Sequence, residues 1–120
     1  MTVEQCKRLK EMGFPQDIGV SAYWEISKGR IESWHTRNLH MCTEICADPT
    51  AEETLAWVSL KLDVIAIYIN DTLYDKPFWI TYVPNNNDCT DDDFDYGFDT
   101  LSDAVYALIE WAYENKLLEA

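Results

Sequence analysis

The stretch Thr100–Asn115, TLSDAVYALIEWAYEN, decides the fold that we expect for this chain. When it is projected at about 100° per residue, its apolar side chains fall on one narrow arc and its acidic side chains on the opposite side. This pattern predicts an amphipathic helix that packs on a flat apolar surface, most simply a β-sheet. The arc consists of Leu101, Val105, Leu108, Ile109 and Ala112, with Trp111 at one edge and Tyr106 and Tyr113 at the other.

Two apolar segments upstream of this helix supply the surface on which we expect it to pack. Residues 63–70, DVIAIYIN, contain six consecutive apolar residues, which indicates a strand in the middle of a sheet or at a subunit interface. Residues 78–83, FWITYV, are its expected antiparallel partner. Pro77 and Pro84 bracket this second strand, and prolines favour the ends and edges of sheets.

The N-terminal half is predicted to begin with a helix and a β-hairpin. A capping box at Thr2 starts a helix that ends at Gly13, where a left-handed residue closes the last turn. Alternating apolar side chains predict a strand over residues 20–26. A turn that contains glycine then returns the chain into a second strand over residues 31–36.

Residues 37–49 leave two alternatives open, a short third strand around Leu39–Ile45 or an irregular crossing. Thr50 and Glu53 then form a capping box for a helix that ends near Lys61. The elements follow the order α-β-β-α-β-β-α, which is typical of an α+β layered fold with an antiparallel sheet of about four strands and helices packed on it. Because no linker or repeat divides the chain, we expect one domain over residues 1–120.

The charge of the chain restricts its partners. Its 22 acidic and 9 basic side chains give a formal net charge of −13. Direct binding to nucleic acid or to an anionic membrane is disfavoured, because both require Lys and Arg to replace counterions. The charge either keeps the protein soluble or forms an acidic face that recognises a basic partner or imitates DNA.

Residues 85–99, NNNDCTDDDFDYGFD, form a loop by composition and hold the first candidate site. Asp91, Asp93 and Asp95 have the alternate spacing that begins an EF-hand loop, but the glycine at its sixth position and the acid at its twelfth are missing. The segment is therefore either a looser divalent-cation site or a solvated loop. In the second case the last acids of the loop stabilise the positive N-terminus of the following helix, a role for which Asp99 and Asp103 are well placed.

Cysteines and histidines supply the atoms for a zinc site or a thiol nucleophile, but not the pattern of either. The C-x-x-x-C pair has no second pair at finger-like spacing, and the sequence contains no nucleophile elbow or glycine-rich oxyanion loop. We therefore expect free thiols, no catalytic residues and no cofactor. The residues considered are His35, His40, Cys42, Cys46 and Cys89.

Compartment signals are also absent from the sequence. The segment Met1–Met12 lacks the apolar core of a secretory signal, and the longest apolar stretch, Leu55–Ile69, is interrupted by charges and too short to span a bilayer. We expect a cytoplasmic protein, in which the cysteines stay reduced.

Aromatic residues exceed what one compact core of this size needs. Since Trp and Tyr are favoured at the centres of interfaces, the surplus favours a homodimer or partner surface. The residues concerned are Trp24, Trp34, Trp57, Trp79 and Trp111, together with Tyr68, Tyr82, Tyr106 and Tyr113.

Two segments, CADPTAEETLAWV at residues 46–58 and GFDTLSDAVYALIEWAYEN at residues 97–115, carry a resemblance. They resemble a recurring type of small bacteriophage or prophage protein that has no assigned function. In that type a PT..E.L.W helix start precedes two strands, and FDT..DA...L..W....N forms the closing helix. The resemblance covers residues 47–115, without the acidic loop, and implies a small α+β fold encoded on a mobile element. It supplies no catalytic residues.

The sequence as a whole favours a non-catalytic cytoplasmic accessory protein that binds a partner protein or a second copy of itself. Two alternatives are a DNA-mimic inhibitor of a DNA-binding protein and a divalent-cation-binding module that uses the Asp-rich loop. A mimic requires carboxylates spaced like phosphates along an elongated face. The candidate partner-binding residues lie at the start and edges of the C-terminal helix: Tyr106, Trp111, Tyr113, Asp92, Asp95 and Asp99.

Overall fold

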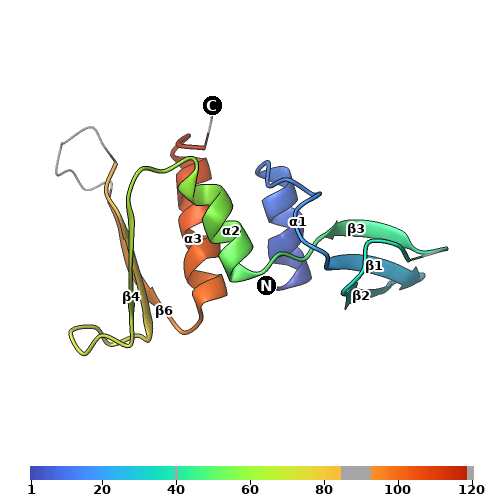
Figure 1. The fold of residues 1–120 in the computed structure, drawn as a ribbon, viewed down its shortest axis with the longest axis horizontal. Helices are drawn as coiled ribbons and strands as arrows, with labels where there is room; N and C mark the ends of the chain where they lie inside the picture. Colours follow the sequence, from blue (N-terminus) through green and yellow to red (C-terminus); the bar gives the residue numbers. More distant parts are fainter. Residues whose placement is uncertain (40, 85–92, 119–120) are drawn as a thin grey trace. The chain divides into compact units, whose positions relative to one another are not determined.

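A computed structural model describes residues 1–39, 41–84 and 93–118 (Figure 1). These residues form helices and antiparallel strands in the order α-β-β-β-α-β-β-β-α, so the protein belongs to the α+β class. The chain divides into two compact units, unit 1 (Met1–Glu53) and unit 2 (Thr54–Ala120), and the boundary falls within the second helix. The expectation of a single domain over residues 1–120 stays a prediction.

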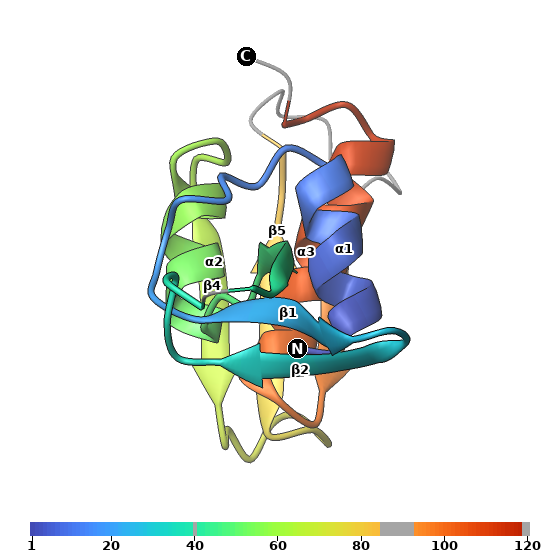
Figure 2. The ribbon, with the colours of Figure 1, turned by 90° about the vertical axis from the view of Figure 1, so that its right-hand side faces the viewer.

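Unit 1 contains a helix and a three-stranded antiparallel sheet. Helix α1 (Val3–Glu11) precedes the strands β1 (Ala22–Ser27), β2 (Arg30–Trp34) and β3 (Thr43–Ala47). The central strand β1 pairs with β2 in the predicted hairpin, which Figure 2 shows, and with β3 on its other side. Helix α1 lies against β3 (Figure 1).

The predicted signals at both ends of α1 are confirmed. The hydroxyl of Thr2 accepts the N–H of Gln5, and the side chain of Gln5 accepts the N–H of Thr2, which completes the capping box. At the other end Gly13 has a φ of +98°, and the N–H of Phe14 donates to the carbonyl of Leu9 at 2.9 Å. A left-handed residue followed by this bond satisfies the last carbonyls of the helix.

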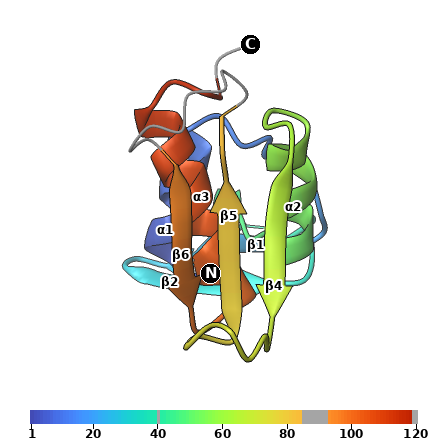
Figure 3. The ribbon, with the colours of Figure 1, turned by 90° about the vertical axis from the view of Figure 1, so that its left-hand side faces the viewer.

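Unit 2 contains a second three-stranded antiparallel sheet with helices on one face. Most of α2 (Ala51–Ser59) belongs to it, followed by β4 (Ile65–Ile69), β5 (Phe78–Tyr82), β6 (Phe94–Phe98) and α3 (Leu101–Glu114). The strands lie in the order β4-β5-β6. Figure 3 looks onto the sheet with the strands in front and both helices behind them.

The placement of the C-terminal helix on this sheet is confirmed. The hydroxyl of Thr100 caps α3 by accepting the N–H of Asp103 at 3.1 Å, and the helix packs on β5 and β6. Of the predicted apolar arc, Leu101 is half-buried and the other four side chains are buried. The buried side chains of unit 2 include Val58, Leu62, Ile80, Tyr82, Phe94, Ala104, Val105, Leu108, Ile109 and Ala112.

The prediction of one sheet of about four strands is wrong, because the described residues form two sheets of three strands each. Two strands account for the difference. β3 occupies part of the segment that the sequence left open, and β6 occupies the end of residues 85–99, which we predicted to be a loop. Asp and Gly are depleted in strands, so Asp95 and Gly97 make β6 hard to recognise as a strand from the sequence. Its alternating aromatic residues nevertheless fit the period of a strand.

The alternative that placed residues 63–70 in the middle of the sheet is wrong, whereas the alternative of a subunit interface stays a prediction. β4, which is apolar on both faces, lies at an edge, and β5 lies in the centre. Pro77 and Pro84 stand just outside β5, so the strand itself keeps every N–H for pairing with its two neighbours. As a consequence β4 retains apolar surface, and Ile69 is 58% exposed.

Candidate functional site

The face of the unit 2 sheet opposite α2 and α3 forms the candidate site, and we call it the outer face (Figure 3). Successive side chains of a strand point to opposite faces, and residues in register on neighbouring strands lie side by side. The helices of unit 2 cover the other face and leave these side chains uncovered. The outer face has two rows, Tyr68–Trp79–Gly97 and Ala66–Thr81–Asp95.

Three aromatic side chains contact one another on the outer face, and we call Tyr68, Tyr74 and Trp79 the aromatic cluster. The ring of Tyr74 stacks on Trp79 with centroids 4.7 Å apart and planes at 21°. Tyr68 lies against Tyr74 at a centroid distance of 5.2 Å. Gly97 makes room for the cluster, because a Cβ at this position would lie 2.5 Å from Cε3 of Trp79.

The connection between β4 and β5 folds Tyr74 back onto the strands. The N–H of Asn70 donates to the carbonyl of Pro77 at 2.7 Å and closes the connection. Within it, the carboxylate of Asp71 accepts the N–H of Leu73 at 2.9 Å, and its carbonyl accepts the N–H of Tyr74 at 3.1 Å. Such bonds from a side chain to the nearby backbone make Asp a turn-forming residue.

Asp95 in β6 lies beside the aromatic cluster, with one carboxylate oxygen held by hydrogen bonds. Its Oδ1 accepts from Nε1 of Trp79 and from Oγ1 of Thr81, the second at 2.9 Å. Its Oδ2 has no hydrogen-bond partner among the residues that the structure describes, and the side chain is exposed. The outer face therefore combines stacked rings with a carboxylate of fixed position.

The hydroxyl of Tyr74 is also affected by its acidic neighbours. Desolvation, the Tyr68 hydroxyl and the carboxylates of Asp95 and Asp71 together raise the pKa of Tyr74 above its ordinary value. A phenolate beside negative charge is disfavoured, so the hydroxyl stays protonated and can donate a hydrogen bond at neutral pH.

The negative charge of the chain is concentrated in unit 2. Residues 54–120 hold thirteen of the 22 acidic side chains and three of the 9 basic ones, so their formal charge is −10, against −3 for residues 1–53. Near the outer face, residues 65–84 and 93–99 include five aspartates and one lysine, and this Lys76 pairs with Asp99 at 3.2 Å. A ligand that approaches this face meets a negative potential.

The predicted cation site stays a prediction, because Asp91 lies outside the described residues. Asp95 already uses Oδ1 in two hydrogen bonds, and Oδ1 of Asp93 is buried without a hydrogen-bond partner in the described part of the chain. Across residues 1–39, 41–84 and 93–118, no three His, Cys, Asp or Glu side chains gather closely enough to hold a metal ion.

Trp111, a predicted partner-binding residue, faces the sheet. Its ring lies 6.1 Å from that of Tyr82 and 5.6 Å from that of Phe94, centroid to centroid. Both partners are buried on the face that α3 covers. Trp111 therefore contributes to the packing between helix and sheet.

Among the other predicted partner-binding residues, Asp95 does not share a surface with Tyr106 and Tyr113. The hydroxyl of Tyr106 donates to Glu110 at 2.8 Å, and Tyr113 is 41% exposed, both on α3. Asp95 lies on the opposite face of the sheet, Asp99 pairs with Lys76, and Asp92 lies outside the described residues. The fold thus places Asp95 apart from Tyr106 and Tyr113.

Sequence reasoning missed the outer face as a site. It counted Tyr68 and Trp79 as surplus aromatics and did not consider Tyr74. The available signal was the strand register: a two-residue period places Tyr68 and Trp79 opposite the inward-facing isoleucines of their own strands. Tyr74 gave no comparable signal, because its position depends on the bonds made by Asp71.

The buried thiols of unit 1 are poor nucleophiles. Burial, followed by the carboxylate of Asp48, raises the pKa of Cys6 to about 12, and burial also raises the pKa of Cys46. Because the thiolate is the reactive form, these side chains are inert at neutral pH. Cys42, the third described cysteine, is a half-buried free thiol.

His35 contacts a serine instead of a cysteine. Nδ1 of His35 and Oγ of Ser21 are 2.8 Å apart, which is the distance of a nucleophile and its base. Among the described residues no carboxylate forms a hydrogen bond to the ring of His35, so the third, orienting member of a triad is missing there. The other candidates, His40 and Cys89, lie outside the described residues.

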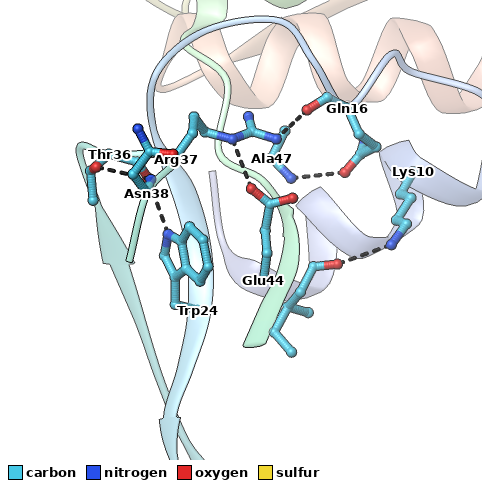
Figure 4. Close-up of polar contacts among 9 residues, drawn as sticks. Lys10, Gln16, Trp24, Thr36, Arg37, Asn38, Glu44 and Ala47 are labelled. Carbon is cyan, nitrogen blue, oxygen red and sulfur yellow. Dashed lines mark hydrogen bonds and ion pairs between the residues drawn. The ribbon is translucent and has the colours of Figure 1, made fainter. Parts of the chain in front are cut away.

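A polar network around Arg37 holds the connections of unit 1 together (Figure 4). Its Nε pairs with Glu44 of β3 at 2.7 Å, and its Nη2 donates to the carbonyl of Gln16. The side chain of Gln16 in turn accepts the N–H of Ala47 at 2.8 Å. These contacts attach the segment after α1 to β3, so we assign the network a structural role within unit 1.

Comparison with models of known protein families, with curated proteins and with solved structures gives no significant match. Within the described ranges, no helix combines the length and the apolar character needed to cross a membrane.

Proposed function

We propose that the protein is a small, acidic, non-catalytic accessory protein of bacteriophage or prophage type that acts in the cytoplasm by binding a partner protein. The outer face is the proposed binding surface. The observation that carries the proposal is the aromatic cluster, whose three contacting rings lie on a sheet face that the helices of unit 2 leave uncovered. Tyr and Trp are the side chains that most often supply binding energy at protein interfaces.

The composition of the outer face supports binding over a purely structural role. When one face of an antiparallel sheet is solvated, its side chains are usually polar. Here Tyr68 and Trp79 stand at these positions, and Tyr68 is 38% exposed.

The state of the described candidate nucleophiles also favours a binding function over a catalytic one. Cys6 and Cys46 are held as thiols by burial, and the Ser21–His35 contact has no orienting carboxylate among the described residues. An activated nucleophile requires a lowered pKa or an oriented base.

Affinity capture with matched variants tests the proposal. The full chain carries a tag, is incubated with host lysate, and is compared with the double variant Tyr68→Ser/Tyr74→Ser and with Tyr113→Ser. Tyr113 is an exposed tyrosine of α3, on the other side of the sheet, and serves as the control. We expect a specific protein that is retained by the wild type and by Tyr113→Ser, and lost with the double variant.

Two results would contradict the proposal. Loss of the partner with Tyr113→Ser, and its retention by the double variant, would move the binding surface to α3. Absence of any specific partner, together with turnover of a metabolite class by the purified protein, would establish an enzyme. Light scattering shows whether the partner is a second copy, because a dimer would have twice the chain mass of 14.0 kDa.

The charge of unit 2 favours a second candidate function, a DNA-mimic inhibitor. Its formal charge is −10, and Asp103 and Glu114 are exposed acids of α3. If the partner is a DNA-binding protein, duplex DNA should compete for it, and Asp103→Asn/Glu114→Gln should weaken capture more than the tyrosine double variant does. The opposite order of effects favours the aromatic cluster.

A further inference from the structure

The shape of the outer face restricts what part of a partner it can hold. Tyr74 stacks on Trp79 with planes 21° apart, so the cluster offers flat ring surface to a flat ligand group. The three rings come from β4, from β5 and from the connection between them. Hydrogen bonds of Asp71 to the backbone fix this connection, so the surface is formed before a ligand arrives.

A carboxylate stands at the edge of the rings. Oδ1 of Asp95 accepts from Trp79 and Thr81, which sets the orientation of the group. Oδ2 takes no hydrogen bond from any described residue, and the side chain is exposed. A ligand that stacks on the rings and carries N–H groups in its own plane could donate to this oxygen.

The negative charge around the outer face favours a positively charged ligand. Residues 65–84 and 93–99 carry five aspartates and one lysine, and Lys76 is already paired with Asp99. Phosphate-bearing ligands such as nucleotides and nucleic acids would be repelled, although their bases also stack on aromatic rings. A cation is attracted both by the carboxylates and by the ring faces.

Among the cationic side chains of proteins, arginine fits this arrangement best. Its guanidinium is planar, stacks on aromatic faces and presents several N–H donors in the plane, whereas the ammonium of lysine is a compact point charge. We propose that the outer face binds an arginine side chain within a basic segment of the partner, with the guanidinium stacked on the aromatic cluster and bonded to Oδ2 of Asp95. This inference rests on the proposed function, because it names the group that the same surface recognises.

Titration of the full chain with model peptides tests the inference. The probes are a short peptide of alternating glycine and arginine, and peptides of the same length with lysine or with neutral citrulline. The readout is the indole N–H signal of Trp79 in ¹⁵N-labelled protein, assigned by comparison with Trp79→Phe. That N–H donates to Asp95, so a ligand at the carboxylate should shift it.

The arginine peptide should shift the Trp79 signal, and the lysine peptide should bind several-fold more weakly because it cannot stack and donate together. The citrulline peptide, which keeps the shape and loses the charge, should cause little shift. Asp95→Asn should weaken arginine binding about tenfold, since a charge-assisted hydrogen bond is lost. Asp75→Asn removes an equal charge from an exposed position in the neighbouring connection and should have a small effect.

Three results would overturn the inference. Equal binding of arginine and lysine peptides, with equal effects of Asp95→Asn and Asp75→Asn, would indicate general attraction by charge. Equal binding of the citrulline peptide, or tighter binding of a nucleotide or sugar, would indicate neutral stacking. If a partner is captured through Tyr68 and Tyr74 but no arginine peptide shifts Trp79, the proposed function holds and the arginine inference fails.

Discussion

A single methyl group at Gly97 should displace the aromatic cluster without unfolding the sheet. A Cβ at this position would lie 2.5 Å from Cε3 and 2.7 Å from Cζ3 of Trp79, and 2.8 Å from Cβ of Lys76. Gly97 does not have a positive φ, so alanine fits the backbone conformation of residue 97, and the Trp79 ring and Cβ of Lys76 must give way. We therefore expect Gly97→Ala to shift the Trp79 ring away from Tyr74 and Asp95.

The cost follows from the contacts that the ring would lose. An aromatic pair contributes about 0.5–1.5 kcal/mol beyond its buried area, and a hydrogen bond about 0.5–1.5 kcal/mol. Alanine offsets part of this loss, because glycine within a strand costs about 0.5–1 kcal/mol relative to alanine. The net destabilisation should be about 1 kcal/mol, which corresponds to a fall in Tm of about 4 °C for a chain of this size.

A double-mutant cycle with Trp79→Ala measures whether the clash is the cause. Thermal unfolding followed by circular dichroism is recorded for the wild type, both single variants and the double variant. Once the ring is absent, Gly97→Ala should cost less than in the wild type, because the clash with Trp79 is removed and only the contact with Cβ of Lys76 remains. An equal cost in both backgrounds, or a Gly97→Ala variant as stable as the wild type, would refute the role we assign to Gly97.

Further predictions concern the two units separately. Leu108→Asp should lower the free energy of unfolding by several kcal/mol in urea titration, because it places an unpaired charge in a fully buried position, and an equally stable variant would show that α3 is placed wrongly. Thr50→Ala should cost about 1 kcal/mol by removing the capping box of α2, in which Thr50 and Glu53 exchange bonds of 2.8 and 3.1 Å, whereas Thr50→Ser should cost little. With a pKa raised from 9.0 to about 12, Cys6 stabilises the fold fully below pH 9 and progressively less as the pH rises toward 12; Cys6→Ala should flatten this decline, and an unchanged decline would contradict it. At pH 8 iodoacetamide should alkylate the half-buried Cys42 before Cys6 and Cys46, as followed by mass spectrometry.

The elements that the sequence predicted well are those specified by nearby residues. Thr2 and Thr50 reach backbone groups three residues ahead, and the arc of α3 repeats within one helix. Such signals depend on spacing along the chain, so they can be read without knowing what the helix packs against. The β1–β2 hairpin belongs to the same class, because its short turn joins strands that pair with each other.

Strand order could not be obtained in this way, because it depends on pairing between distant segments. β3 pairs with β1 across the whole hairpin, and β6 pairs with β5 across a long acidic stretch. The apolar side chains of β4 suggested a central strand. A hydrophobic sequence, however, indicates only that these side chains are shielded from water, and contact with a partner surface shields them as well as a neighbouring strand does. The exposed Ile69 on this edge strand is consistent with the second alternative in that prediction.

The role of Asp95 in the candidate site also could not be predicted from the sequence, because it depends on pairing between distant strands. In the sequence Asp95 is one acid among six in residues 85–99, and its neighbours suggest a solvated loop. Its chemistry arises only when β6 pairs with β5, because Thr81 is then its register partner and the indole of Trp79 reaches its Oδ1. Gly97, which weakens the strand signal, is the residue that admits the Trp79 ring. The features that hid this strand in the sequence are therefore the ones that build its outer face.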